Sequence, residues 1–173
     1  MNNFIPDIYQ RNIFTINYQK LKERGIKCLL FDLDNTLAPM MAKEPSKELK
    51  ELFMHLDELN FKVVIISNSG QERVLPFKEG LNVDSACRSL KPFCYKYIKI
   101  LKIYKYKECE VAAIGDQILT DILGANIMGI TSIFVEQLSP DDFFGTKINR
   151  FFERLILKNL KSRGIYEKGK YYD

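Results

Sequence analysis

The chain has 173 residues, of which 46% are hydrophobic and 28% charged, a balance that excludes wholesale disorder and suits one compact domain over residues 1–173. We recognise no secretory signal and no apolar run near the roughly 20 residues of a membrane span, so we expect a cytoplasmic protein, soluble or peripheral to a membrane. The net charge of +4 is uneven: residues 143–173 carry eight basic and three acidic side chains, whereas the remainder carries 18 and 19.

Strand-like and helix-like patterns alternate along the chain. The apolar runs are dense in Val, Ile and Leu without alternation, which is typical of parallel strands buried on both faces. We therefore predict a three-layer α/β/α sandwich with a mainly parallel, Rossmann-like sheet. The expected strands are 27–33, 61–67, 82–86, 110–116 and 131–135, and the expected helices are 45–59, 71–80, 92–105 and 118–128.

Cysteine and histidine usage excludes several classes of enzyme. Cys28, Cys87, Cys94 and Cys109 are scattered, with no Cys-x-x-Cys pair, so reduced and mostly buried thiols are expected rather than disulfides or a zinc site. The only histidine, His55, sits in a helical pattern, and a lone histidine cannot build a zinc cluster. His-based triads and most zinc hydrolases are thereby excluded.

Polar clusters follow three of the predicted strands. They are "DLDNT" at 32–36, "SNS" at 67–69 and "GDQILTD" at 115–121, and a fourth cluster, "LKP" at 90–92, stands just before a helix. In a parallel sheet, ligands bind beyond the carboxyl ends of the strands, so all four clusters are expected at one edge.

The chemistry of these clusters points to magnesium and a phosphate. Crowded carboxylates repel one another unless a cation is present, and hard oxygen ligands without His or Cys favour Mg²⁺. Lys91 would add positive charge, and Ser67 a hydroxyl beside the N–H groups of a helix start. One aspartate of the pair can then act as nucleophile, while the carboxylate two residues on protonates the leaving oxygen and later activates water.

Each cluster alone has an ordinary explanation. Asp-x-Asp is often a turn, Ser-Asn-Ser after a strand is usually a helix cap, and Asp121 could be a surface residue of a helix. Their ordered occurrence, each where a site at the strand ends needs it, favours the catalytic interpretation.

The same residues resemble a known superfamily. "DLDNTL", "SNS", "KP" and "GDQILTD" are similar to motifs I to IV of the haloacid dehalogenase (HAD) superfamily of phosphatases. The resemblance implies that Asp32 is the nucleophile and a magnesium ligand. It implies that Asp34 is the general acid/base and a ligand through its carbonyl, and that Thr36 braces the motif I turn beside the phosphate site.

The later motifs supply the rest of the implied site. Ser67 would bind phosphate with Asn68 beside it, and Lys91 would hold both the nucleophile and the phosphate. Asp116 would ligate magnesium directly, with Asp121 in support. The superfamily pattern that "SNS" resembles has Ser-Asn-Asn, so Ser69 departs from it.

The sequence that flanks the motifs resembles, more narrowly, that of the short subclass IIIA phosphatases that act on phosphatidylglycerophosphate. It extends over nearly the whole chain, through "GIKCLLFDLDNTLAP", "FKVVIISNSGQERVLPF", "AAIGDQILTDILGANIMGITSIFV" and "GTKINRFFERLI". Only 29 residues lie between Leu37 and Ser67, too few for a large cap domain. An open site favours large substrates, a lipid headgroup among them.

Two basic segments remain. The amphipathic segment at about 143–173 could be a C-terminal helix packed on the domain, or an interfacial helix attracted to anionic lipid, or both. The stretch "KPFCYKYIKILKIYKYK" interleaves Lys with Tyr, but the three-residue spacing of Lys96, Lys99 and Lys102 is typical of a solvated helix face. No nucleic-acid partner is expected.

We therefore predict a magnesium-dependent HAD phosphatase that converts phosphatidylglycerophosphate to phosphatidylglycerol at the inner face of a membrane. Two alternatives stay open: a phosphatase on a small soluble metabolite, with a purely structural tail, and a binding protein that keeps the fold without turnover. The complete catalytic set in this sequence argues against the second.

Overall fold

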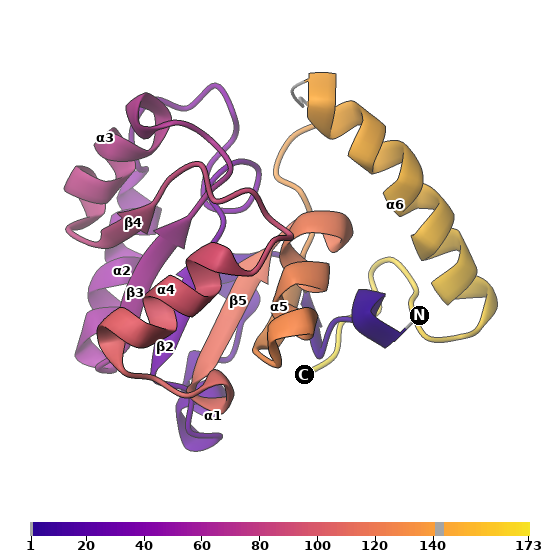
Figure 1. Ribbon diagram of the computed structural model, residues 1–173, viewed down its shortest axis with the longest axis horizontal. Coiled ribbons are helices and arrows are strands. Elements are labelled where there is room, and N and C mark those ends of the chain that lie inside the picture. The colour runs from indigo at the N-terminus through magenta and orange to yellow at the C-terminus, as the bar shows by residue number, and fades with distance from the viewer. Residues whose placement is uncertain (1, 141–143) are drawn as a thin grey trace.

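Six parallel strands form one sheet in the order β1-β6-β5-β2-β3-β4 (Figure 1). The computed structural model describes residues 2–140 and 144–173, and side chains for 3–140 and 149–173. The strands are β1 (Ile8–Gln10), β2 (Cys28–Phe31), β3 (Lys62–Ile66), β4 (Asp84–Ala86), β5 (Val111–Gly115) and β6 (Thr131–Val135). The predicted parallel α/β fold is confirmed.

Helices cover both faces of the sheet (Figure 1). The longer ones are α1 (Tyr18–Glu23), α2 (Lys47–Glu58), α3 (Gln71–Leu81), α4 (Tyr95–Tyr104), α5 (Leu123–Met128) and α6 (Phe144–Ser162). Short turns of helix are η1 (Asn2–Phe4), η2 (Ile13–Thr15), η3 (Glu108–Glu110) and η4 (Ile118–Ile122).

Strand side chains alternate between two hydrophobic cores, because successive residues of a strand point to opposite faces. In β2, Leu29 and Phe31 pack with α1, α2 and α3, whereas Cys28 and Leu30 pack with α4 and α5. All four are fully buried, so the strand is shielded on both faces. The non-alternating apolar run in the sequence follows directly from this position at the centre of the sheet.

Within the described residues, no large cap interrupts the sheet edge. The chain between β2 and β3 forms only a loop and α2, and α3 and β4 fill the next interval. Ser46 caps α2 by accepting from the N–H of Leu49, and Gly70 precedes α3 as its N-cap residue. The helices begin beyond the strand ends, which leaves the carboxyl edge open.

The structure differs from the predicted elements in three places. The strand β1 and the helix α1 were not predicted, because both are short and β1 lies at the edge of the sheet. The predicted helix 118–128 begins as a single π-helical stretch, η4, before it continues as α5. The predicted helix 92–105 begins three residues later than expected, at Tyr95, and a turn precedes it.

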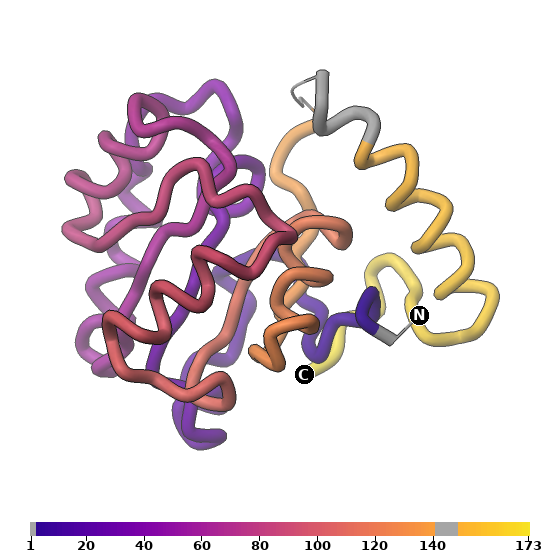
Figure 2. The backbone as a smooth tube through the Cα atoms, in the orientation of Figure 1, coloured from indigo at the N-terminus to yellow at the C-terminus, as the bar shows by residue number. Residues whose placement is uncertain are grey.

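The C-terminal region packs on the β1 side of the sheet. Leu160 and Tyr166 share a hydrophobic cluster with Tyr9 and Phe134. Tyr172 pairs with Tyr9 through two backbone hydrogen bonds of 2.9 Å, so the last residues run beside the N-terminal segment (Figure 2). Among the described residues, no helix is long and apolar enough to cross a membrane.

Candidate active site

The predicted clusters meet at the carboxyl edge of three adjacent strands. Asp32 follows β2 at the centre, Ser67 follows β3 on one side, and Asp116 follows β5 on the other. Asp32, Ser67 and Lys91 line a cavity of about 620 Å³, together with Asp34, Asn35, Met40, Asn68, Ser69, Gly70, Arg73, Gln117, Thr120 and Asn149. The loops that carry the predicted clusters therefore converge at the carboxyl edge of the sheet.

Three buried carboxylates, which we call the carboxylate floor, lie together at this edge: Asp32 lines the cavity, whereas Asp116 lines a neighbouring one. Asp32, Asp116 and Asp121 each offer an oxygen within 4.8 Å of the others, a spacing that one cation can bridge. Asp121 reaches this position because Gly115 has no side chain: a Cβ there would lie 2.3 Å from the Asp121 carboxyl carbon. The N–H of Gln117 also donates to Asp121 at 3.1 Å.

Lys91 is the cation at the centre of the floor. Its ammonium donates to Asp32 Oδ1 and to Asp121 Oδ1, both at 2.6 Å, and the side chain is almost fully buried. Burial by itself would lower the pKa of Lys91, but the Asp121 and Asp32 carboxylates raise that pKa overall. The ammonium is therefore held protonated against the proposed nucleophile.

The carboxylates carry more negative charge than the protein neutralises at this point. Burial raises the pKa of Asp32 to about 8 and that of Asp116 to about 6, although Lys91 and Arg150 pull in the other direction. Three carboxylates face two protein cations. A divalent cation bound among these oxygens would stabilise their charged forms.

Asp34 points away from the floor. Its carboxylate accepts from the Ser69 hydroxyl at 2.6 Å and from Arg73 Nε at 2.8 Å. Arg73 also donates to the carbonyls of Pro39 and Ala42, so one guanidinium fixes both Asp34 and the loop that follows it. Arg73 and Ser69 were not predicted as site residues.

The side chains of the remaining predicted residues form hydrogen bonds to neighbouring residues of the site. Asn68 accepts from the Lys91 N–H at 2.7 Å and donates to the Lys91 carbonyl at 3.3 Å, which ties the "SNS" cluster to the "LKP" cluster. Ser67 accepts from the Ser69 N–H at 3.0 Å. Thr36 does not line the cavity; its hydroxyl donates to Asp116 Oδ1 at 3.1 Å.

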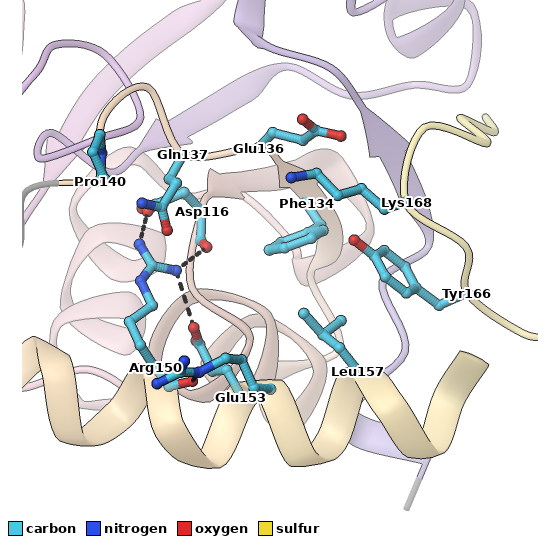
Figure 3. A pocket seen from close by; sticks show the side chains of 11 residues that line it. Asp116, Phe134, Glu136, Gln137, Pro140, Arg150, Glu153, Leu157, Tyr166 and Lys168 are labelled. Atoms are coloured by element: carbon cyan, nitrogen blue, oxygen red, sulfur yellow. Dashed lines mark hydrogen bonds and ion pairs between the residues drawn. The ribbon is translucent and has the colours of Figure 1, made fainter. Parts of the chain in front are cut away.

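Arg150 of α6 reaches the site from outside the sheet. Its guanidinium pairs with the Asp116 carboxylate, donates to the Asp116 carbonyl at 2.7 Å and contacts Glu153 at 3.0 Å (Figure 3). Glu153 in turn accepts from the Leu119 N–H at 3.1 Å, and burial raises the pKa of Glu153 to about 7. Neither residue was predicted, since nothing local in "NRFFER" marks a contact 34 residues away.

Asn149 and Arg150, adjacent in α6, line different cavities. Asn149 borders the cavity above Asp32, and Arg150 borders a second one of about 610 Å³. Figure 3 shows this second cavity between α6 and the end of β6, with Phe134, Leu157 and Tyr166 along it. The amino-terminal part of α6 thus forms a wall of the catalytic edge.

The predicted basic segment at 143–173 is helical over α6, although residues 141–143 and the side chains of 144–148, Lys147 among them, lie outside the described part. One side of α6 is buried through Glu153 and Leu160. Its other side exposes three large apolar residues and two lysines: Phe151, Phe152, Leu155, Lys158 and Lys161. Packing on the domain, one of the two predicted roles, is therefore observed.

Fold and carboxylate cluster together define a phosphatase of the HAD superfamily. The family model described as "Mitochondrial PGP phosphatase" matches residues 1–138. "Probable phosphatase YqeG" of Bacillus subtilis (strain 168) is 38% identical over 161 residues, which are 93% of this chain and 94% of that one. The chain belongs to the PGP phosphatase family.

Solved structures agree at the level of the fold. The cobalt-bound deoxy-D-mannose-octulosonate 8-phosphate phosphatase of Haemophilus influenzae superposes with a TM-score of 0.55 at 14% identity, over 88% of this chain and 98% of that one. An uncharacterized protein from Listeria monocytogenes gives a TM-score of 0.54 at 16% identity, over 76% and 99%.

Proposed function

We propose that the protein is a magnesium-dependent phosphomonoester hydrolase that acts through an aspartyl-phosphate on Asp32. Its proposed substrate is phosphatidylglycerophosphate, and its product phosphatidylglycerol. The observation that carries the proposal is the floor of three buried carboxylates within 4.8 Å of one another, with Lys91 at 2.6 Å from two of them. A purely structural role would not explain this much buried charge, because the desolvation of each buried ion costs on the order of several kcal/mol.

The donor set fits magnesium. Asp32, Asp116 and Asp121 offer hard carboxylate oxygens, the Asp34 carbonyl is a further candidate ligand, and no His or Cys lines the cavity. When bound, the ion would supply positive charge beside the phosphoryl oxygens. Thr36 would orient Asp116 through its 3.1 Å hydrogen bond.

The protein's own groups account for both steps. Asp32 Oδ attacks phosphorus, the bond from phosphorus to the alcohol oxygen breaks, and Asp34 gives its proton to that oxygen. Asp34 then takes a proton from a water molecule, which attacks the aspartyl-phosphate, releases phosphate and restores Asp32. Lys91 and Ser67 hold the phosphoryl oxygens in place.

The lipid substrate is supported by the family and by the openness of the site. A site with no large cap admits a headgroup that stays attached to a membrane. We propose that α6 adds peripheral contact with anionic lipid through its exposed basic face, since each basic residue near such a surface contributes about 1 kcal/mol. Lys158→Gln with Lys161→Gln should then weaken sedimentation with anionic vesicles, and more so at low salt.

Phosphate release from a panel of substrates tests the proposal. Phosphatidylglycerophosphate in mixed micelles is compared with sugar phosphates, nucleotides and p-nitrophenyl phosphate, with magnesium and with chelator. We expect the highest kcat/KM on the lipid, loss of turnover with chelator, and loss of turnover in Asp32→Asn. Preference for a soluble phosphoester would overturn the lipid assignment, and inertness on the whole panel would overturn the enzyme assignment.

A further inference from the structure

In the tight turn around Lys91 the charged side chain is buried and the neighbouring apolar side chains are exposed. The Phe93 N–H donates to the Leu90 carbonyl at 2.9 Å, and between them Lys91 is only 6% exposed. Its apolar neighbours face outward instead: Leu90 is 69% exposed, Phe93 72% and Tyr95 69%. The burial of Lys91 is explained by its carboxylate partners. The exposure of large apolar side chains beside the site is not explained by packing and points to an interaction surface.

A second loop places an apolar residue on another side of the same cavity. Met40 lines the cavity, and the next residue, Met41, is 83% exposed. This loop is held in place, because Arg73 donates to the carbonyls of Pro39 and Ala42 on either side of the two methionines. We call Met41, Leu90, Phe93 and Tyr95 the apolar rim.

The charge on the side of the rim that carries Leu90, Phe93 and Tyr95 is of one sign. From residue 85 to residue 107 the sequence has seven Lys or Arg and no Asp or Glu. Arg88 and Lys99 are exposed, and Lys96 is partly so. Aromatic and aliphatic side chains among cations are the composition that an anionic lipid interface favours, with apolar groups in the acyl boundary and cations at the headgroups.

We propose that the apolar rim inserts into an anionic lipid surface, so that the protein meets the membrane with its active-site edge first. This inference rests on the proposed lipid substrate. The two rim loops border one cavity, so a protein partner laid across them would cover its entrance. A lipid surface laid there instead brings headgroups to the entrance, which Asn149 of α6 also borders.

The absence of tryptophan from the chain makes insertion directly measurable. In Phe93→Trp the single indole reports on the rim. In Met54→Trp it reports on α2, on the opposite face of the sheet, where Met54 is 60% exposed. Vesicles contain phosphatidylglycerol and phosphatidylcholine, with or without brominated acyl chains.

We expect the Phe93→Trp emission to shift to the blue on vesicle addition and to be quenched by brominated lipid, while Met54→Trp shows neither effect. Vesicle binding without either change in Phe93→Trp would overturn the inference, because contact would then be made by α6 alone. A blue shift that grows with protein concentration without vesicles would also overturn it, since a second copy would then cover the rim.

Turnover separates this inference from the proposed function. Leu90→Ser with Phe93→Ser should lower phosphate release from vesicle-borne phosphatidylglycerophosphate at least tenfold, with p-nitrophenyl phosphate turnover unchanged. Equal activity of this variant and wild type on vesicles would overturn the rim. If wild type instead hydrolyses no lipid while Phe93→Trp still inserts, the substrate assignment fails and the surface stands.

Discussion

At the scale of single residues, Arg73 decides where the proposed acid/base stands. Its guanidinium contacts the Asp34 carboxylate and two carbonyls of the following loop. The ring of Phe77, one turn further along α3, lies 4.8 Å below that guanidinium. Asp34 is thereby fixed in position without touching the carboxylate floor.

Replacement of Arg73 should slow chemistry more than binding. Arg73→Ala is expected to lower kcat about 10- to 100-fold, because a displacement of about 1 Å at a reacting group can cost that much. KM should change little, since Arg73 contacts Asp34 rather than the phosphate. Arg73→Lys should recover only part of kcat, and Lys78→Ala on the same helix is the matched control. A kcat equal to wild type in Arg73→Ala would refute this positioning role.

Three of the predicted site residues directly follow the ends of central strands. Asp32, Ser67 and Asp116 follow buried apolar runs, so one rule about parallel sheets brought them together. Arg73 and Arg150 could not be found this way, because their partners lie 39 and 34 residues away and follow no local pattern. The direction of the Asp34 side chain depends on the same distant contacts.

At the scale of elements, α6 is attached to the catalytic edge by one buried group of charges. Arg150 contacts Asp116, and Glu153 accepts from the Leu119 N–H at the start of η4. Apolar packing at Leu160 and Tyr166 holds the other end of this region on the sheet. Arg150 therefore links α6 directly to Asp116, a proposed metal ligand.

Loss of that contact should loosen α6 locally. In Arg150→Met we expect faster amide hydrogen exchange over α6 and η4, with β2 and β3 as protected as in wild type. Lys158→Met, an exposed change on the same helix, should leave exchange as it is. Unchanged protection of α6 in Arg150→Met would show that apolar packing alone holds the helix.

Element prediction succeeded for the central strands, which are buried on both faces, and missed the edge strand β1. Central strands β2, β3 and β5 are apolar throughout because both faces are covered. In contrast, β1 has three residues and depends on β6 and Tyr172 for its pairing. Asp121, inside the π-helical η4, packs against Gly115, a contact that no periodicity reveals.

At the scale of the whole molecule, the six-stranded sheet presents its carboxyl edge to the catalytic cavity. The central order β5-β2-β3 brings the ends of three strands beside one cavity, and no large insertion closes it. The rim loops lie beside this cavity, and α6 forms another part of its border. The proposed lipid contact and the proposed phosphoryl transfer would then share one edge of the protein.

Intact-protein mass spectrometry of Asp34→Asn tests directly whether Asp32 becomes phosphorylated. With p-nitrophenyl phosphate, whose leaving group needs no proton, the first step should proceed while water activation stalls. We expect a mass increase of one phosphoryl group, labile to hydroxylamine, located at Asp32 and absent from Asp32→Asn with Asp34→Asn. Phosphate release by Asp34→Asn with no such adduct, or an adduct at another residue, would contradict phosphorylation of Asp32.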